Sequence, residues 1–433
     1  MSPVEVGLVG IAAMIALFLL RMPVALAMAL VGFVGFGSLS SFGAAASLLA
    51  RDFFGQFNSY GLSAITLFVL MGSFGFSAGL GQRLYRAAHA VLGPMPGGLG
   101  LSTVLACAGF AAISGSTAAT AATMGRIALP EMRRYEYNMT LASGSVAAAG
   151  TLGILIPPST VFLVYGFLTE QSIGALFVAG VLPGLLLALL FGLTIYVICR
   201  VRPELGPPAE PLPWRERLRE TLGAAQVLAL FLLVIGGLFL GWFSPTQAGG
   251  IGAAGALLLG AVNRRLNWRG LLADTRDGLR TSVMILSLIA GATVFGRFMA
   301  VTRIPFLIAD WIGTLPFSPA VITWVIVMIF FIGGFFMDAM ALVTLLVPVL
   351  YPVVLQLGLD PIWFGVIVVL TAELGVITPP VGVNVYVIKG IAPEIPLGTI
   401  FRGIMPFLLA IFVVVGVVVA WPEFTLLLPN LMR

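Results

Sequence analysis

Long apolar runs alternate with short polar segments along the whole chain, and the runs approach the roughly 20 residues that a helix needs to cross a membrane. The pattern therefore predicts a series of membrane-spanning helices. We expect single spans at residues 6–20, 23–43, 61–80, 140–167, 174–198, 224–242, 248–262, 281–301 and 360–388, and a C-terminal helix within 396–433.

Arginine clusters orient these spans, because Lys and Arg in short loops mark the cytoplasmic side of a membrane. The clearest clusters lie in the loops expected at 200–220 and 263–280. Counting crossings from these loops places Arg133 inside and both Arg303 and Arg433 outside. Both chain termini are then expected on the periplasmic side.

The apolar stretch 99–130 would begin and end on the cytoplasmic side, although one continuous helix of that length would reach roughly 48 Å. We therefore predict a re-entrant hairpin. Its tip is the small, polar segment Ser114-Gly115-Ser116-Thr117-Ala118-Ala119-Thr120. The alternative is a small-residue packing face of an ordinary membrane helix. The count of crossings between the arginine clusters favours the hairpin, because it puts both ends of the stretch on the same side.

An internal repeat supports this interpretation. Residues 152–159, LGILIPPS, return 222 positions later as LGVITPPV at 374–381, and the same offset carries Ser116 onto Asp338. Asp338 lies in a second long apolar stretch, 319–352, which is predicted to be a hairpin entering from the outside. Matching elements then have opposite orientations.

The predicted fold is an all-α polytopic membrane protein with an inverted-topology repeat, two re-entrant helical hairpins and two broken helices. This architecture points to a secondary transporter whose site lies near the membrane midplane.

Composition agrees with a membrane protein: 60% of residues are hydrophobic and 9% are charged, against about 25% charged in soluble domains. The 22 basic and 17 acidic residues give a formal charge of +5, but the basic residues are dispersed, which excludes a nucleic-acid binder. Cys107 and Cys199 form neither a disulfide framework nor a metal site. Glu5 precedes the first apolar run and Arg21 follows it, the reverse of a secretory signal, so the first helix is expected to be retained.

Two double prolines, Pro157-Pro158 and Pro379-Pro380, are expected to interrupt their spans, because proline removes an amide donor and clashes with the preceding turn. Freed carbonyl oxygens suit Na⁺, and helix N-termini suit a carboxylate. Nearby hydroxyl and amide groups can complete an oxygen shell for a hard cation rather than for a transition metal. They are Ser114, Ser116, Thr117, Thr120, Ser159, Thr378 and Asn384.

Two acidic residues lie at expected membrane depth, where ionisable groups are costly and are therefore functional candidates. Asp338 could coordinate a cation or cap the N-terminus of the second hairpin arm. Glu373 could contact an ion or serve as a structural partner of a hydroxyl or backbone amide. Arg297 could attract an anion, but its position near a membrane end favours ordinary snorkelling to the interface.

Other classes of protein fit less well. An intramembrane serine enzyme would need a general base near Ser116, and the only histidine, His89, lies outside the hairpin tip. An ATP-driven pump would need a Gly-Lys-Ser/Thr phosphate loop, whereas Lys389, the sole lysine, follows Ile388. No enzymatic activity is therefore expected. A self-sufficient ion-coupled carboxylate transporter remains an alternative within transport.

Four segments together resemble the large membrane subunit (DctM-like, M subunit) of tripartite ATP-independent periplasmic (TRAP) transporters. They are 115–122, 152–159, 334–338 and 373–384, and with chain length and span order they cover essentially the whole sequence. The resemblance implies Na⁺-driven import of an organic acid that a periplasmic substrate-binding protein delivers. It also implies residence in a bacterial or archaeal cytoplasmic membrane, with Na⁺ as coupling ion and no cofactor.

The resemblance further implies an elevator mechanism, in which a transport domain moves against a fixed scaffold. The transport domain would comprise 81–173 and 302–395, with scaffold helices in 1–80 and 174–301 and a C-terminal helix in 396–433. A small four-helix membrane subunit would accompany the scaffold. It is expected as a separate chain, because no additional four-helix block precedes Pro23 or follows Pro422.

Sodium sites are implied where each hairpin tip meets a broken helix. On the first side the candidates are Ser114, Gly115, Ser116, Thr117, Thr120, Gly153, Pro157, Pro158 and Ser159. On the second side they are Gly333, Gly334, Asp338, Glu373, Gly375, Thr378, Pro379, Pro380 and Asn384.

Overall fold

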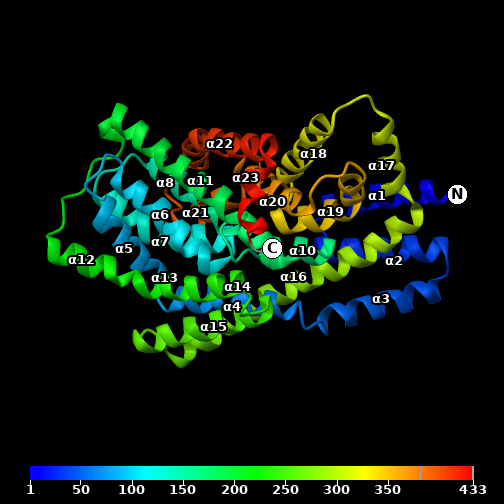
Figure 1. Ribbon diagram of the computed structural model, residues 1–433, viewed down its shortest axis with the longest axis horizontal. Coiled ribbons are helices and arrows are strands. Elements are labelled where there is room, and N and C mark those ends of the chain that lie inside the picture. Colours follow the sequence, from blue (N-terminus) through cyan, green and yellow to red (C-terminus); the bar gives the residue numbers. More distant parts are fainter. Residues whose placement is uncertain (381, 432–433) are drawn as a thin grey trace.

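The computed structural model describes residues 1–380 and 382–431, where every regular element is a helix (Figure 1). Six helical stretches of this part are long and apolar enough to cross a membrane, and one bent helix pair would make a seventh. Val381 of the second double-proline segment and Arg433, which we expect outside, lie beyond the described residues. The chain is thus an all-helical, multi-span membrane protein.

The N-terminal part contains more helices than the apolar runs predict. Its elements are α1 (Pro3–Leu19), α2 (Val24–Leu39), α3 (Phe42–Phe57), α4 (Ser63–Ser77) and α5 (Leu80–Leu92). Helix α3 was not anticipated, because Arg51 and Asp52 interrupt its apolar pattern. Asp52 is buried and pairs with the half-exposed Arg297, with 2.6 Å between Oδ2 and Nε. A buried carboxylate requires such a partner.

Helices α4 and α5 form the bent pair, with an angle of 63° between them. Gly79 separates them with a φ of +72°, a left-handed conformation that glycine adopts without strain. The next elements are α6 (Gly98–Ser114), α7 (Thr117–Arg134), α8 (Met139–Gly150), α9 (Leu152–Leu155), α10 (Thr160–Thr169) and α11 (Ile173–Val201). Helices α6 and α7 form a helical hairpin, and the helix that starts with α8 is broken after α9.

The two expected arginine-rich loops are wrong in part. Their region contains the 3₁₀ turn Pro203–Leu205, α12 (Trp214–Gly223), α13 (Ala225–Phe231), the π-helical segment Leu232–Gly236, α14 (Gly237–Phe239), α15 (Pro245–Val262) and α16 (Trp268–Thr302). In α12, acidic and basic side chains lie one turn apart, an arrangement that stabilises exposed helices. In α16, the Asn267 side chain caps the helix by accepting from Gly270 N, so the helix begins well before its apolar part.

The second half contains a hairpin and a broken helix of the same kind. Its elements are α17 (Ile304–Thr314), α18 (Pro319–Gly334), α19 (Ala339–Gln356), α20 (Pro361–Ile377), α21 (Val383–Ile391), α22 (Leu397–Ala420) and α23 (Pro422–Asn430). Helix α17 was not anticipated. The expected single C-terminal helix is divided at Trp421, where Pro422 begins α23.

The 222-residue offset of the sequence repeat relates whole elements of the two halves. It carries α7 onto α19 with no shift of either end, and it carries α2, α5, α6, α10 and α11 to within three residues of α15, α17, α18, α21 and α22. Helices α8 and α9 together correspond to α20. In Figure 1 the bases of the two hairpins lie toward opposite ends of the molecule, the first on the left and the second on the right.

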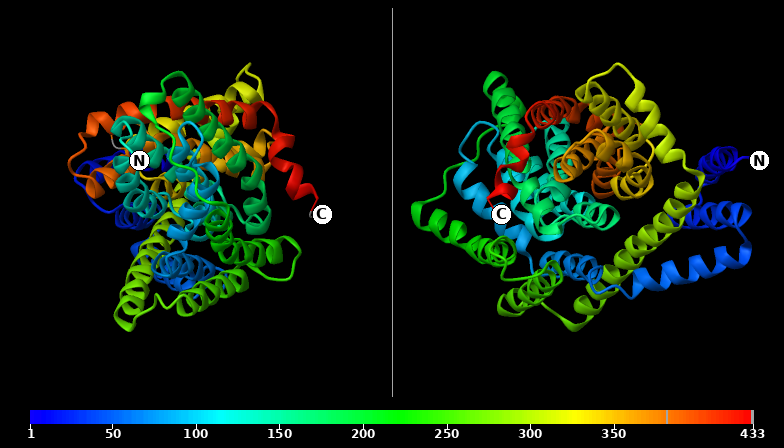
Figure 2. Two further views of the ribbon diagram at one scale, coloured as in Figure 1. Left: turned by 90° about the vertical axis from the view of Figure 1, so that its left-hand side faces the viewer. Right: turned by 45° about the vertical axis from the view of Figure 1, so that its right-hand side comes forward.

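Close helix packing surrounds the broken helices. Residues 141–150 of α8 are fully buried, and Gly144 lies against the backbone of Gly403 in α22. A side chain at either glycine would push the helices apart, as at small-residue interfaces of membrane helices. Figure 2 shows α16 running along one side of the bundle beside the blue N-terminal helices, and α16 packs closely against α2 and α4.

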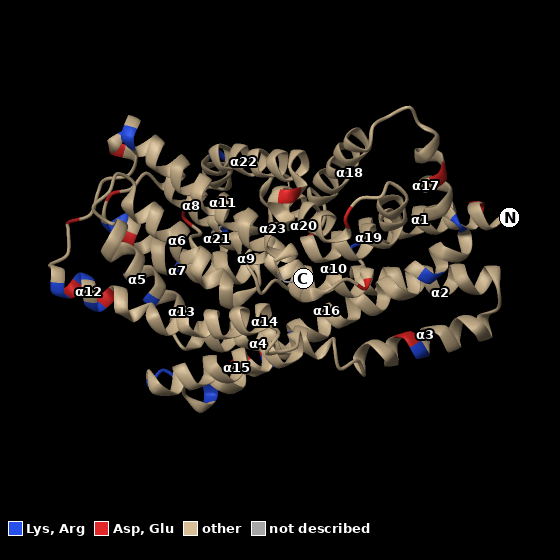
Figure 3. Ribbon diagram, in the orientation of Figure 1, with Lys and Arg blue, Asp and Glu red and all other residues tan. Residues whose placement is uncertain are grey.

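Charged side chains gather toward the two ends of the long axis and along α12, and they are sparse in the central part of the bundle (Figure 3). The hairpin tips and helix breaks lie in that central part. The few charged groups near them therefore become candidates for function.

Candidate functional site

The first hairpin tip is built by three short-range features. Gly115 ends α6 with a φ of +59°, and Ser116 caps α7, its side chain accepting a hydrogen bond from Ala119 N. The hydroxyl groups of Ser114 and Thr120 lie 2.6 Å apart across the tip. The tip therefore turns the chain back on itself, as the sequence predicts.

This tip contacts the first helix break directly. Thr160, the first residue of α10, donates hydrogen bonds from N and Oγ1 to the carbonyl oxygen of Gly115, at 3.3 and 2.8 Å. A Cβ atom on Gly115 would lie 2.7 Å from Pro158 O, and one on Gly153 would collide with Ser116 O. The candidates of the first side thus lie together, although Thr160, which makes the key contact, was not among them.

The second tip meets the second helix in the same manner. The Cα atoms of Gly334 and Gly375 are so close that a Cβ on Gly334 would lie 2.7 Å from the Gly375 Cα. Asp338 caps α19, and its Oδ1 accepts from the amides of Met340 at 3.0 Å and Ala341 at 3.2 Å. The capping role of Asp338 is therefore present in the structure.

The second break differs from the first in its surroundings. Pro157 and Pro158 are buried, whereas Pro379 and Pro380 are exposed. The buried Asn384 of α21 donates from Nδ2 to Ala147 O of α8, at 3.1 Å. The sequence places Asn384 with the second side, but its amide lies against the first broken helix.

Glu373 is the most unusual of the candidate residues. Its side chain is fully buried in α20, and neither carboxylate oxygen has a hydrogen-bond partner among the described residues. Asn384 Oδ1 likewise has no partner there. The expected structural partner of Glu373, a hydroxyl or backbone amide, is therefore not present in the described part of the chain. Buried polar atoms of this kind are rare, because each costs the full desolvation penalty.

A cavity of about 490 Å³ lies where the two tips approach α16. Ser114 and residues 116–119 of the first tip and Asp338 of the second tip line it, together with Thr160. Four further lining residues were not identified from the sequence: Arg126, Asp274, Asp277 and Thr281. Asp274 and Asp277 fall within 263–280, which the sequence predicts to be a loop, and Arg126 and Thr281 carry no local signal of their own.

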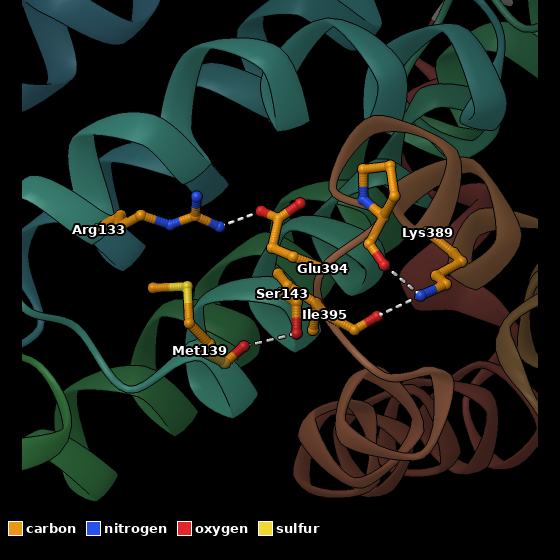
Figure 4. A network of polar contacts seen from close by, with 7 residues as sticks. Arg133, Met139, Ser143, Lys389, Glu394 and Ile395 are labelled. Atoms are coloured by element: carbon orange, nitrogen blue, oxygen red, sulfur yellow. Dashed lines mark hydrogen bonds and ion pairs between the residues drawn. The ribbon is translucent and has the colours of Figure 1, made fainter.

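A polar network ties the base of the first hairpin to the second half (Figure 4). Arg133 of α7 forms an ion pair with Glu394, which follows α21. This hydrogen-bonded guanidinium lowers the pKa of the Glu394 carboxyl, which lies outside the membrane-spanning segments. Lys389 donates to the carbonyl oxygens of Pro393 and Ile395. The two halves are therefore linked beyond their apolar contacts.

The chain matches the family model described as "Tripartite ATP-independent periplasmic transporter, DctM component" over residues 11–424. The chain belongs to this family. As a TRAP transporter permease component it is a multi-pass membrane protein and not an enzyme.

Relatives at 34–38% identity share this family. The C4-dicarboxylate TRAP transporter large permease protein DctM of Pseudomonas aeruginosa is 38% identical over 387 residues, which cover 88% of this chain and 89% of the relative. The sialic acid TRAP transporter large permease protein SiaM of Vibrio cholerae is 35% identical over 383 residues, with the same shares of the two chains.

A further relative is longer. The isethionate TRAP transporter permease protein DctMQ of Oleidesulfovibrio alaskensis is 34% identical over 403 residues, which cover 90% of this chain but 62% of the relative.

Among solved structures, the Neisseria gonorrhoeae MtrF transporter aligns with a TM-score of 0.62 at 15% identity, over 87% of this chain and 83% of that one. At this identity the likeness concerns the fold alone.

Within the described residues, no group of three or more His, Cys, Asp or Glu side chains could hold a metal ion. The oxygen atoms near the tips are hydroxyl, carbonyl and single carboxylate groups. Such groups suit an alkali cation better than a transition metal.

Proposed function

We propose that this TRAP permease component imports an organic acid across the cytoplasmic membrane of a bacterium or archaeon, coupled to Na⁺. The observation that carries the proposal is the convergence of both hairpin tips, each against an interrupted helix, on one cavity. Interrupted helices at corresponding positions of a repeat are the usual substrate and ion sites of secondary transporters.

The buried oxygen atoms fit a cation. A fully buried carboxylate is very unfavourable unless a counter-charge or proton accompanies it, and the carboxylate of Glu373 has neither a cationic nor a hydrogen-bonding partner among the described residues. Na⁺ near Glu373 and the Gly334–Gly375 contact would supply that charge. The corresponding first site would lie at Ser114–Thr120 and Gly153–Ser159, with Asn384 contributing from the other half.

The proposal includes an elevator mechanism. We assign residues 81–173 and 302–395 to a moving transport domain, and residues 1–80, 174–301 and 396–433 to the scaffold. The Arg133–Glu394 pair joins the two parts of the transport domain, and α16 supplies the scaffold wall of the cavity.

Two partner proteins belong to the proposal. The word tripartite in the family description supports three components. The relative DctMQ, which is longer than the part this chain matches, supports a small membrane subunit beside the scaffold. A periplasmic binding protein would deliver the substrate. The relatives named for C4-dicarboxylates and sialic acid support a carboxylate as cargo.

The first test compares melting temperatures of the purified chain in NaCl, KCl and choline chloride at equal ionic strength, alone and with the small subunit. A saturable rise specific to Na⁺ in either preparation is expected. Uptake by proteoliposomes containing the permease subunits should then require an inward Na⁺ gradient and the binding protein. Absence of any Na⁺ effect on stability and uptake would refute the coupling, and uptake without the binding protein would favour a self-sufficient carboxylate transporter.

The proposed inverted repeat, with both termini periplasmic, has a separate test. A cysteine replacing Arg303, between α16 and α17, should react with a membrane-impermeant thiol reagent added outside intact cells. A cysteine replacing Arg217 in α12 should react only after the cells are opened. The reverse pattern would invalidate the proposed orientation of the halves.

A further inference from the structure

The cavity between the two tips has an unequal distribution of charge. Arg126 of α7 is the one basic side chain among its described lining residues, and Asp274, Asp277 and Asp338 are the acidic ones. The carboxylate of Asp338 already accepts two amide hydrogen bonds at the N-terminus of α19. The charges not engaged in this way are therefore Arg126 on the hairpin and two aspartates on α16.

Arg126 is placed to reach a ligand in this cavity. It continues a stripe of cavity-lining residues, Ala119, Ala122 and Thr123, along one face of α7, about 10 Å from the tip. No acidic group of the described residues lies within 4.0 Å of its guanidinium, since the ion pairs there involve other arginines. Arg126 also lines a neighbouring cavity of about 360 Å³ beside α5, so it stands where the two spaces meet.

We infer that Arg126 binds the carboxylate of the transported organic acid, and that Asp274 and Asp277 select against a second carboxylate at the opposite end of the ligand. A guanidinium presents a planar pair of donors that matches a carboxylate in two hydrogen bonds. The negative charges of the two aspartates would repel a second carboxylate across a partly dehydrated cavity and so make the binding free energy of such a ligand less favourable. The favoured substrate class is thus an acid with one carboxylate and an uncharged or cationic remainder.

This inference rests on the proposed transport function and names its substrate class. The small residues Ala119 and Ala122 leave room for the body of the ligand between Arg126 and the first tip. The hydroxyl groups of Ser116, Thr117 and Thr281, on the two sides of the cavity, can bond a hydroxylated or amide-bearing remainder.

The experiment measures uptake by proteoliposomes that contain the chain with its small subunit, supplied with the binding protein. The probes are pyruvate, N-acetylneuraminate and succinate. Arg126→Gln, Arg126→Lys and the matched control Arg134→Gln are compared with the wild type, because Arg134 lies on the same helix, is exposed and is outside the cavity. Melting temperatures with and without Na⁺ accompany each assay.

Arg126→Gln is expected to lower kcat/KM at least tenfold for the transported acid, mainly through KM, while the Na⁺-dependent rise in melting temperature stays unchanged. Arg126→Lys should recover part of the loss, and Arg134→Gln should behave as the wild type. Asp277→Asn should raise uptake of succinate relative to pyruvate at least threefold.

Several results would overturn the inference. Unchanged uptake in Arg126→Gln, or an equal loss in Arg134→Gln, would show that no carboxylate depends on Arg126. Loss of the Na⁺-dependent rise in melting temperature in Arg126→Gln would show that Arg126 maintains the structure rather than binds the substrate. A constant succinate-to-pyruvate ratio in Asp277→Asn would remove the selective role of α16. A wild type that takes up no probe and shows no Na⁺-dependent rise in melting temperature would refute the proposed function, and the inference would fall with it.

Discussion

Glu373→Gln tests whether the buried carboxylate binds the coupling ion. Glutamine has nearly the same shape as glutamate but no charge, so the buried site keeps its packing and loses its attraction for a cation. Without Na⁺, the variant is expected to be at least as stable as the wild type, because it no longer buries an ionisable group without a partner. With Na⁺, the order should reverse.

The size of the effect follows from ligand linkage. One ion at about ten times its Kd stabilises the native state by about 1.4 kcal/mol. At about 2.1 cal/mol/K per residue, a chain of 433 residues has an unfolding entropy near 0.9 kcal/mol/K, so one site raises the melting temperature by about 1.5 °C. At a hundred times Kd, about 2.7 kcal/mol corresponds to about 3 °C.

The assay is a Na⁺ titration of the melting temperature at constant ionic strength, with K⁺ as the replacement ion. Glu204→Gln is the matched control, since Glu204 is exposed and follows α11. Glu373→Gln should lose the shift of one site, and the control should keep the full shift. A complete Na⁺ shift in Glu373→Gln would refute the argument that an ion compensates this carboxylate.

Three further predictions concern the tips and the network at the hairpin base. Gly115→Ala would force alanine into the left-handed φ of Gly115 and crowd Pro158 O, so thermal unfolding should show a loss of about 1–3 kcal/mol in stability. The control Gly43→Ala adds a methyl group in open space and should be nearly neutral. Equal effects of the two variants would contradict the tip packing. Asp338→Asn should keep the cap and the melting temperature within about 1 °C but impair Na⁺-driven uptake, and normal uptake would exclude a role in transport. Arg133 lowers the pKa of the Glu394 carboxyl in the folded state. The stability from their ion pair is therefore fully present above the unfolded-state pKa of Glu394 and is lost as pH falls through its folded-state pKa. The difference in melting temperature between wild type and Glu394→Gln should shrink on acidification, and a constant difference would exclude this linkage.

The sequence was sufficient for the parts of the site that leave a local signal. Both hairpins and both helix breaks could be located from the double prolines, the small polar tip and the common offset. The tips and breaks depend on backbone chemistry within a few residues, so they leave a signal in the local sequence. The common offset relates α19 to α7 with no shift of either end.

Other features depend on tertiary contacts that no local pattern records. Helix α3 escaped prediction because Arg51 and Asp52 interrupt its apolar run, and the need for Asp52 becomes clear only when Arg297 is beside it. The sequence predicts a loop over 263–280, where the structure has the charged first part of α16, because hydropathy marks only the part of a helix that meets lipid. Asp274 and Asp277 were missed for the same reason.

The length of α16 ties this protein to the thickness of its membrane. Its 35 residues extend for about 52 Å, while the hydrocarbon core of a bilayer is about 30 Å thick. The apolar part from Thr281 onward, about 33 Å, nearly matches that core, so the segment bearing Asp274 and Asp277 projects beyond it. A thinner bilayer would be accommodated by tilt of this helix, at a modest cost per ångström of hydrophobic mismatch. Since α16 forms a wall of the cavity, lipid chain length would change the shape of the binding space itself.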